Sequence, residues 1–170
     1  MRFKDKIFIA GHKGLFGSAI LNLLKKKGFY NLVVVEKKKV NLEDQRQVDI
    51  FFKKTKPKYV FLAAARAGGI LANIKRPGEF IYKNLAIQNN IIHAAYKNKV
   101  ERLLFLGSSC IYPKNFSNKI KETDLLSGPL EETNKPYAIA KIAGVFLCDS
   151  YNNQYFNKKK RFRAIIPPNL

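Results

Sequence analysis

The chain has 170 residues, and 46% of them are apolar, which suits one domain with a sizeable core. It has neither a long uncharged apolar run nor a signal-peptide pattern, so no membrane span is expected and the cytoplasm is the expected compartment. The two cysteines do not suggest a disulfide scaffold. The two histidines, His12 and His93, lie too far apart to suggest a metal site.

The net charge of +20 arises largely from basic clusters at residues 25–27, 37–39, 53–56 and 158–161. Such a charge can attract nucleic acids or acidic membranes. Because the clusters fall at the ends of predicted elements rather than along one helix, a solvated lysine-rich surface is favoured. We therefore expect no specific nucleic-acid partner and no membrane partner. The same field would also favour a small polyanion such as a nucleotide phosphate.

Apolar runs alternate with amphipathic stretches along the chain. They predict, in order, strand 6–10, helix 17–27, strand 32–35, helix 44–55, strand 59–63, helix 79–98, strand 102–106, helix 137–153 and strand 162–166. Asn41 is expected to cap a turn before residue 44, and residues 111–132 are predicted to be a loop. Short apolar strands indicate a parallel sheet covered on both faces, and hence an α/β, doubly wound fold of the Rossmann type.

Three glycines follow the first predicted strand at three-residue intervals, Gly11, Gly14 and Gly17. A strand, a tight glycine turn and a helix together form a site where a pyrophosphate approaches the helix N–H groups. The spacing differs from the usual G-x-G-x-x-G fingerprint. Dinucleotide binding is therefore the favoured interpretation, and an ordinary turn whose glycines serve only packing is the alternative. The small residues 64–69, after the third strand, predict a second ligand-facing loop.

A second group of residues carries chemistry. Ser108 follows the fourth strand, and Tyr137 and Lys141 are one helical turn apart, so they share a helix face. A neighbouring ammonium lowers the pKa of a phenol, which would let Tyr137 exchange a proton with a carbonyl oxygen near neutral pH. A Tyr-x-x-x-Lys pair also arises by chance on helix surfaces. The order of glycine loop, serine, tyrosine and lysine favours hydride transfer to a carbonyl.

The glycine loop, Ser109-Cys110 and Tyr137-x-x-x-Lys141 resemble the extended short-chain dehydrogenase/reductases. A narrower resemblance rests on residues 8–12, 64–70, 90–95, 103–113 and 136–144. It points to the enzymes that epimerise C3 and C5 of GDP-4-keto-6-deoxy-D-mannose and then reduce C4 with NADPH. A GDP-sugar substrate, NADP(H) and a homodimer formed through helices 79–98 and 137–153 are what this resemblance implies. Another nucleotide-sugar epimerase of the family and a non-catalytic dinucleotide-binding module are the alternatives.

The resemblance also implies roles for individual residues. Tyr137 would donate the proton in the reduction, Lys141 would hold the nicotinamide ribose, Ser108 would hold the sugar carbonyl oxygen, and Cys110 would act as acid and base in the epimerisation. The implied cofactor contacts are Gly11, His12, Lys13, Gly14, Leu15, Phe16, Gly17, Lys37, Asn41, Leu42, Leu106, Gly107, Ser108, Ser109, Lys141, Pro167, Pro168, Asn169 and Leu170.

Two departures from the family pattern bear on these expectations. Glu36 ends the second strand, where an acid commonly binds the ribose of NAD, whereas a cation accommodates the phosphate of NADP. Lys13 and Lys37 favour NADP(H). In addition, Pro168 stands where the family has threonine, and family members continue well beyond residue 170. We therefore expect residues 1–170 to be an NADP(H)-binding domain without the sugar-nucleotide-binding domain, and the truncated chain to be defective in the full reaction.

Overall fold

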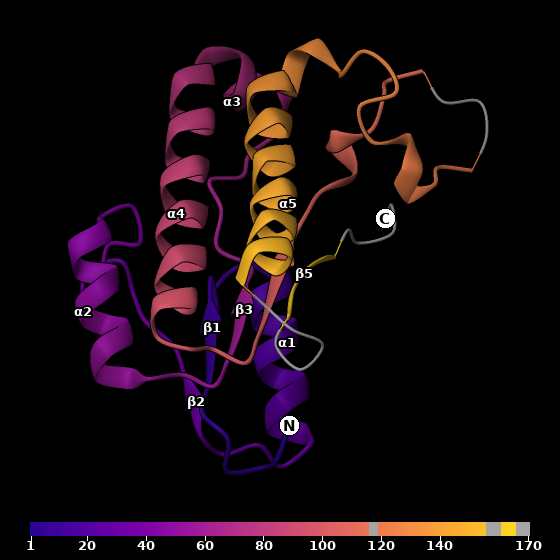
Figure 1. Ribbon diagram of the computed structural model, residues 1–170. Coiled ribbons are helices and arrows are strands. Elements are labelled where there is room, and N and C mark those ends of the chain that lie inside the picture. The colour runs from indigo at the N-terminus through magenta and orange to yellow at the C-terminus, as the bar shows by residue number, and fades with distance from the viewer. Residues whose placement is uncertain (116–118, 156–160, 166–170) are drawn as a thin grey trace.

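The computed structural model describes residues 1–115, 119–155 and 161–165. The strands of this part are parallel and form one sheet in the order β2-β1-β3-β4-β5 (Figure 1). They are β1 (Ile7–Ala10), β2 (Leu32–Val33), β3 (Tyr59–Leu62), β4 (Arg102–Leu106) and β5 (Arg161–Ile165). The α-helices are α1 (Leu15–Lys26), α2 (Gln45–Thr55), α3 (Ile70–Lys75), α4 (Pro77–Lys97) and α5 (Lys135–Tyr155). The α/β, doubly wound fold is confirmed.

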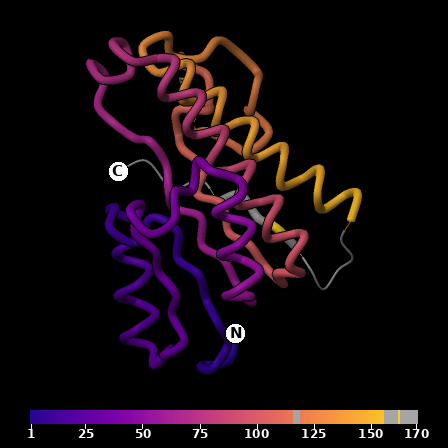
Figure 2. The backbone as a smooth tube through the Cα atoms, turned by 90° about the vertical axis from the view of Figure 1, so that its left-hand side faces the viewer, coloured from indigo at the N-terminus to yellow at the C-terminus, as the bar shows by residue number. Residues whose placement is uncertain are grey.

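The sheet is buried on both faces by different helices. Ile7 and Ile9 of β1 pack with residues of α1 on one face, whereas Phe8 and Ala10 pack with residues of α2 and α4 on the other. Figure 2 shows α1 on one side of the sheet and the group of α2, α4 and α5 on the opposite side. Alternate side chains of a strand point to opposite faces, so a continuous apolar strand requires cover on both sides.

Three local features differ from the sequence-based expectation. β2 is only two residues long, because the chain leaves the sheet at Val34 and turns over residues 37–39. A short helix, α3, follows the loop 64–69 and ends at Lys75, and Arg76 alone separates it from Pro77, where α4 begins. Within the described part of residues 111–132 the chain forms a 3-10 turn, η2 (Glu122–Asp124), rather than an entirely irregular loop.

The chain reverses its direction of winding beside β1, which pairs with β2 on one side and β3 on the other. Ligands of open α/β sheets bind at such a switch point, beyond the carboxyl ends of the strands. The glycine loop follows β1 and the loop 64–69 follows β3, so both predicted ligand loops lie at this point. The fold therefore places the predicted site where the topology expects one.

Many lysines lie at the opposite edge of the sheet, because the helices end there. Lys25 and Lys26 lie in the last turn of α1, Lys53 and Lys54 in that of α2, and Lys97 in that of α4. Cations at these positions complement the negative end of the helix dipole. No helix in the described ranges is long and apolar enough to cross a membrane.

Candidate functional site

The three glycines of the loop have different structural roles. Gly11 has φ +87°, and a Cβ there would lie 2.6 Å from the backbone nitrogen of Ala64. A Cβ on Gly17 would lie 2.1 Å from the carbonyl oxygen of Gly11, whereas a Cβ on Gly14 would meet only that oxygen, at 3.5 Å. Gly11 and Gly17 are thus required by close backbone packing. Gly14 is not, and its missing side chain leaves open space.

The N-terminus of α1 begins at this open position. Gly14 is its N-cap residue and supplies no side-chain hydrogen bond, and the first turn carries no acidic residue. The first N–H groups of a helix lack partners within the helix, and the helix dipole places partial positive charge there. This end of α1 is consequently suited to an anion such as a pyrophosphate.

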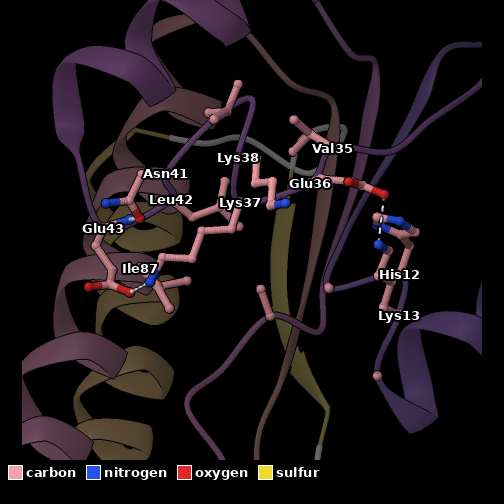
Figure 3. A pocket seen from close by; sticks show the side chains of 14 residues that line it. His12, Lys13, Val35, Glu36, Lys37, Lys38, Asn41, Leu42, Glu43 and Ile87 are labelled. Carbon is pink, nitrogen blue, oxygen red and sulfur yellow. Dashed lines mark hydrogen bonds and ion pairs between the residues drawn. The ribbon is translucent and has the colours of Figure 1, made fainter.

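A cavity of about 370 Å³ lies on one side of Gly14, between the glycine loop and the segment after β2 (Figure 3). It contains the predicted positions Gly11, His12, Lys13, Gly14, Lys37, Asn41 and Leu42. The other residues that line it are Val35, Glu36, Lys38, Val40, Glu43, Ala64 and Ile87. Asn41 caps the turn as expected, since its side-chain oxygen accepts a hydrogen bond from the Glu43 backbone N–H at 3.2 Å.

Two ion pairs cross this cavity (Figure 3). Lys13 Nζ lies 2.7 Å from Glu36 Oε1, and Lys37 Nζ lies 2.8 Å from Glu43 Oε1. The hydrogen bond from Lys13 lowers the pKa of Glu36, so the Glu36 carboxyl is ionised near neutral pH. Both lysines predicted to favour a phosphate therefore already have a carboxylate partner.

A second cavity, of about 560 Å³, lies on the other side of Gly14 and is bounded by β3, β4 and α5. It contains the predicted positions Gly14, Leu15, Phe16, Gly17, Leu106, Gly107, Ser108, Ser109, Tyr137 and Lys141. Ala63, Ala65 and Ala67 complete its lining. Three of the four predicted catalytic residues, Ser108, Tyr137 and Lys141, thus share one cavity although they are far apart in sequence, and Gly14 lines both this cavity and the first. Ala65 and Ala67 belong to the loop 64–69, which its small residues and its place after the third strand predicted to face a ligand.

Lys141 is buried beneath the second cavity, with 2% of its surface exposed. Its Nζ donates a hydrogen bond of 2.7 Å to the carbonyl oxygen of Leu106 and lies 5.8 Å from the centre of the Tyr137 ring. Burial lowers its pKa from 10.5 to about 8. Gly144 allows this position, because a Cβ there would lie 2.5 Å from the Phe105 ring, so α5 packs directly on β4.

The expected effect of Lys141 on Tyr137 is not found. Burial raises the pKa of the Tyr137 phenol above its usual value, and a hydrogen bond with Ser108 only partly opposes that rise. Lys141 instead directs its ammonium to the carbonyl oxygen of Leu106. The prediction of a lowered pKa was therefore wrong for the site as it stands: Tyr137 keeps its proton at neutral pH.

Cys110 lies beside the second cavity, in the 3-10 turn η1 (Ser109–Ile111). Its Sγ accepts a hydrogen bond of 3.4 Å from the side-chain amide of Asn134, and its backbone N–H donates to Ser108 Oγ at 3.3 Å. The second cysteine, Cys148, is buried in α5, and burial raises its pKa to about 12. Of the two thiols, Cys110 is therefore the accessible one.

The loops around both cavities are fixed by polar residues of α4 that the sequence analysis did not single out. Asn84 accepts a hydrogen bond from the backbone N–H of Arg66 at 2.9 Å and donates one to its carbonyl at 3.0 Å. Asn90 donates to the carbonyl of Leu42 at 3.1 Å, and the buried Gln88 donates to that of Ala140 at 2.6 Å. A polar residue on an apolar helix face is the only sequence signal for this role.

The last four predicted cofactor positions, Pro167, Pro168, Asn169 and Leu170, lie outside the described residues. Within the described ranges, no group of three or more His, Cys, Asp or Glu side chains is placed to hold a metal ion.

Comparisons with known proteins agree with this geometry. The chain is 52% identical over 167 residues to the GDP-L-fucose synthase of Escherichia coli (strain K12), a match that covers 98% of this chain and 51% of that protein. The solved structure of DdhaC superposes with a TM-score of 0.96 at 54% identity, covering 99% of this chain and 48% of that one. MlghC, a GDP-mannoheptose C4 reductase from Campylobacter jejuni with NADP bound, superposes with a TM-score of 0.92 at 44% identity, covering 98% of this chain and 52% of that one.

The chain thus spans about half the length of the curated relatives it matches. Their names confirm the resemblance that the glycine loop and the segment 103–113 indicated. The model of the NAD dependent epimerase/dehydratase family matches residues 7–170, from β1 to the last residue. The protein therefore belongs to the NAD dependent epimerase/dehydratase family.

Proposed function

We propose that residues 1–170 form an NADP(H)-binding domain that carries the carbonyl-reducing site of a GDP-sugar epimerase/reductase. One observation carries the proposal: Ser108, Tyr137 and Lys141 line the same cavity as the uncapped N-terminus of α1. Similarity to GDP-L-fucose synthases makes GDP-4-keto-6-deoxy-D-mannose the proposed substrate and GDP-L-fucose the proposed product.

The residues present fit a nicotinamide dinucleotide. The open face of Gly14 and the free N–H groups of α1 suit its pyrophosphate, and the cavities on either side give room for its two nucleoside halves. The first cavity would hold the adenosine, with Lys13 and Lys37 near the ribose phosphate that distinguishes NADP from NAD. The second would hold the nicotinamide, with Lys141 at its ribose. NADPH, when bound, supplies the hydride that reduces the carbonyl carbon.

Tyr137 would then provide the proton for the carbonyl oxygen. Its raised pKa keeps the phenol protonated, which is the form that an acid needs at the start of a reduction. The Ser108 hydroxyl would donate a hydrogen bond to the same oxygen and stabilise the negative charge that develops there. The buried ammonium of Lys141 would stabilise the phenolate that remains after the proton has moved.

The same oxygen-binding pair would serve the epimerisation. Hydrogen bonds from Ser108 and Tyr137 to the C4 carbonyl oxygen would make the protons on C3 and C5 more acidic. Cys110 would remove a proton from one face of one of these carbons, with the electron pair held on the C4 oxygen, and inversion would require a different acid to return a proton to the opposite face. The Asn134 amide, 3.4 Å from Cys110 Sγ, would support the thiolate during this exchange.

The function is tested by incubating the chain with NADPH and GDP-4-keto-6-deoxy-D-mannose and following the loss of NADPH absorbance. Product analysis then identifies the sugar. Formation of GDP-L-fucose supports the proposal, and reduction without inversion at C3 and C5 would limit it to a GDP-sugar reductase. NADPH binding without turnover of this substrate would show the defect expected of the truncated chain and would leave residues 1–170 as a dinucleotide-binding module, whereas absence of NADPH binding would overturn the proposal.

The charge of Lys141 predicts a pH dependence. Raising the pH through about 8 removes the ammonium charge, so the affinity for the anionic NADPH should fall. The expected loss is roughly tenfold between about pH 7 and about pH 9, measured by fluorescence titration.

The free energy of unfolding should respond to pH in the opposite direction. The pKa of Lys141 is about 8 in the folded chain and 10.5 in the unfolded chain. Between about pH 8 and pH 10.5 the unfolded chain therefore binds more protons than the folded chain. Lys141 consequently increases the free energy of unfolding as the pH rises through this range.

Lys141→Met, which keeps the length of the side chain without its charge, is the control for both measurements. It should flatten the dependence of NADPH affinity on pH and remove the matching rise in stability. An affinity that falls equally steeply in Lys141→Met would show that another group is responsible.

We further propose that the protein acts as a cytoplasmic homodimer formed through α4 and α5. Exposed large apolar side chains on these helices support the interface: Tyr82, Ile139, Phe146 and Tyr155. Exposed large apolar side chains favour association with another protein surface. The location follows from the proposed reactants, because NADPH and sugar nucleotides are charged and do not cross membranes unaided. Sedimentation of the chain at increasing concentration tests the dimer.

A further inference from the structure

The first cavity contains a carboxylate that the family resemblance does not assign to any role. Glu43 precedes α2, lines the cavity and holds Lys37 at 2.8 Å (Figure 3). Lys37 is one of the two lysines that would meet the ribose phosphate of NADP. A phosphate and the Glu43 carboxylate would therefore compete for the same ammonium.

The two partners of this ion pair differ in solvent exposure. The Glu43 side chain is 20% exposed, whereas that of Lys37 is 70% exposed. The backbone N–H of Glu43 is bound to the side chain of Asn41, and the Asn41 backbone N–H is bound to Gln47 Oε1 of α2 at 2.8 Å. The carboxylate is thus held by the loop before α2, and the long lysine side chain reaches to it.

We propose that Glu43 is a specificity-determining residue that weakens the binding of the 2′-phosphate of NADP by retaining Lys37. The proposal rests on the proposed cofactor-binding function of the same site. A 2′-phosphate gains Lys37 only by breaking or sharing the ion pair with Glu43, and it also meets the negative charge of the carboxylate. A cofactor without that phosphate does neither, so Glu43 reduces the preference for NADP over NAD.

Glu36 differs from Glu43 in its expected effect. It holds Lys13 at 2.7 Å, but it also stands at the end of the β2 segment, where a carboxylate accepts hydrogen bonds from the ribose hydroxyls of NAD. Removing the charge of Glu36 should change the binding of both cofactors in opposite directions. Removing the charge of Glu43 should change only the binding of the phosphorylated one. Lys38, which also lines the cavity, makes no ion pair within the described residues.

The test measures the binding of adenosine 2′,5′-bisphosphate and of adenosine 5′-monophosphate by calorimetry. These probes differ only in the 2′-phosphate and need neither the nicotinamide nor turnover. In Glu43→Gln the bisphosphate should bind roughly fivefold more tightly than in the unchanged chain, and the monophosphate should be unaffected within about a factor of two. Asp49→Asn is the matched control, because Asp49 forms an ion pair of 3.2 Å with Lys97 on the same side of the sheet but outside the cavity. It should change neither affinity.

A double-mutant cycle with Lys37→Ala identifies the mechanism. If Glu43 retains Lys37, Lys37→Ala should cost more bisphosphate affinity in the Glu43→Gln background than in the unchanged chain, since the lysine is then free to bind phosphate. Equal losses in both backgrounds, or no gain in Glu43→Gln, would overturn the proposal. So would a gain for both probes, which would indicate a general charge effect. If the unchanged chain binds neither probe nor NADPH, the proposed cofactor-binding function is refuted. That result differs from the outcomes above, in which the unchanged chain binds the probes and only the role of Glu43 is refuted.

Discussion

Tyr137→Phe should reduce the rate of NADPH-dependent carbonyl reduction by roughly 10³-fold, because it removes the proton donor and leaves the ring in place. The phenol is buried beside Ser108 in the second cavity, where its raised pKa keeps it protonated. The Tyr137 ring also packs edge-on against Phe80 with centroids 6.4 Å apart, a contact that phenylalanine keeps. Affinity for NADPH should therefore stay within about twofold of the unchanged chain.

Tyr112→Phe is the matched control for this variant. Tyr112 is also buried with a raised pKa, but it packs with Ile111 and Ile142 and does not line either described cavity. Its substitution should leave the rate of reduction essentially unchanged. The assay compares the initial rates of both variants at saturating NADPH. Equal rates in Tyr137→Phe and the unchanged chain would remove Tyr137 from the chemistry.

Gly17→Ala and Gly14→Ala should separate the packing role of the glycine loop from its binding role. A Cβ on residue 17 would lie 2.1 Å from the Gly11 carbonyl oxygen, so the start of α1 must move away from the loop. We expect Gly17→Ala to lower the free energy of unfolding by about 2–4 kcal/mol and to abolish NADPH binding. Gly14→Ala meets only an ordinary contact, and as an N-cap substitution it should cost less than about 1 kcal/mol.

Gly14→Ala should nevertheless weaken NADPH binding by roughly 100-fold, since its methyl group occupies the junction of the two cavities over the helix N-terminus. Urea denaturation gives the stability of both variants, and fluorescence titration gives their affinity. If Gly14→Ala keeps full affinity, then the glycines serve only the turn, which is the alternative that the sequence left open.

The fold was predictable because its signals are local. Alternate residues of β1 face different helices, which makes the strand continuously apolar. The length of β2 was not predictable from the β-branched run 32–35, because a turn over residues 37–39 draws the chain out of the sheet. The helix α3 was missed because its six residues, between glycines and Pro77, are too few to show a period.

The residues that line the candidate site could be predicted from the sequence about as well as the fold could. The pKa values and ion pairs within the site could not. Spacing placed Tyr137 and Lys141 on one helix face, and topology brought Ser108 to the same cavity. Burial is the main cause of the raised Tyr137 pKa, and the spacing of residues in the sequence does not reveal burial. The partner of Lys37 is likewise set by the path of the loop between Asn41 and α2, which brings Glu43 to it.

The most direct test of the central claim is a fluorescence titration of the unchanged chain with NADPH and with NADH. The claim is that the cavities joined at Gly14 form a nicotinamide dinucleotide site that favours the phosphorylated cofactor. It predicts saturable binding of NADPH, with weaker binding of NADH and competition by adenosine 2′,5′-bisphosphate. Absence of saturable binding of both dinucleotides would contradict it.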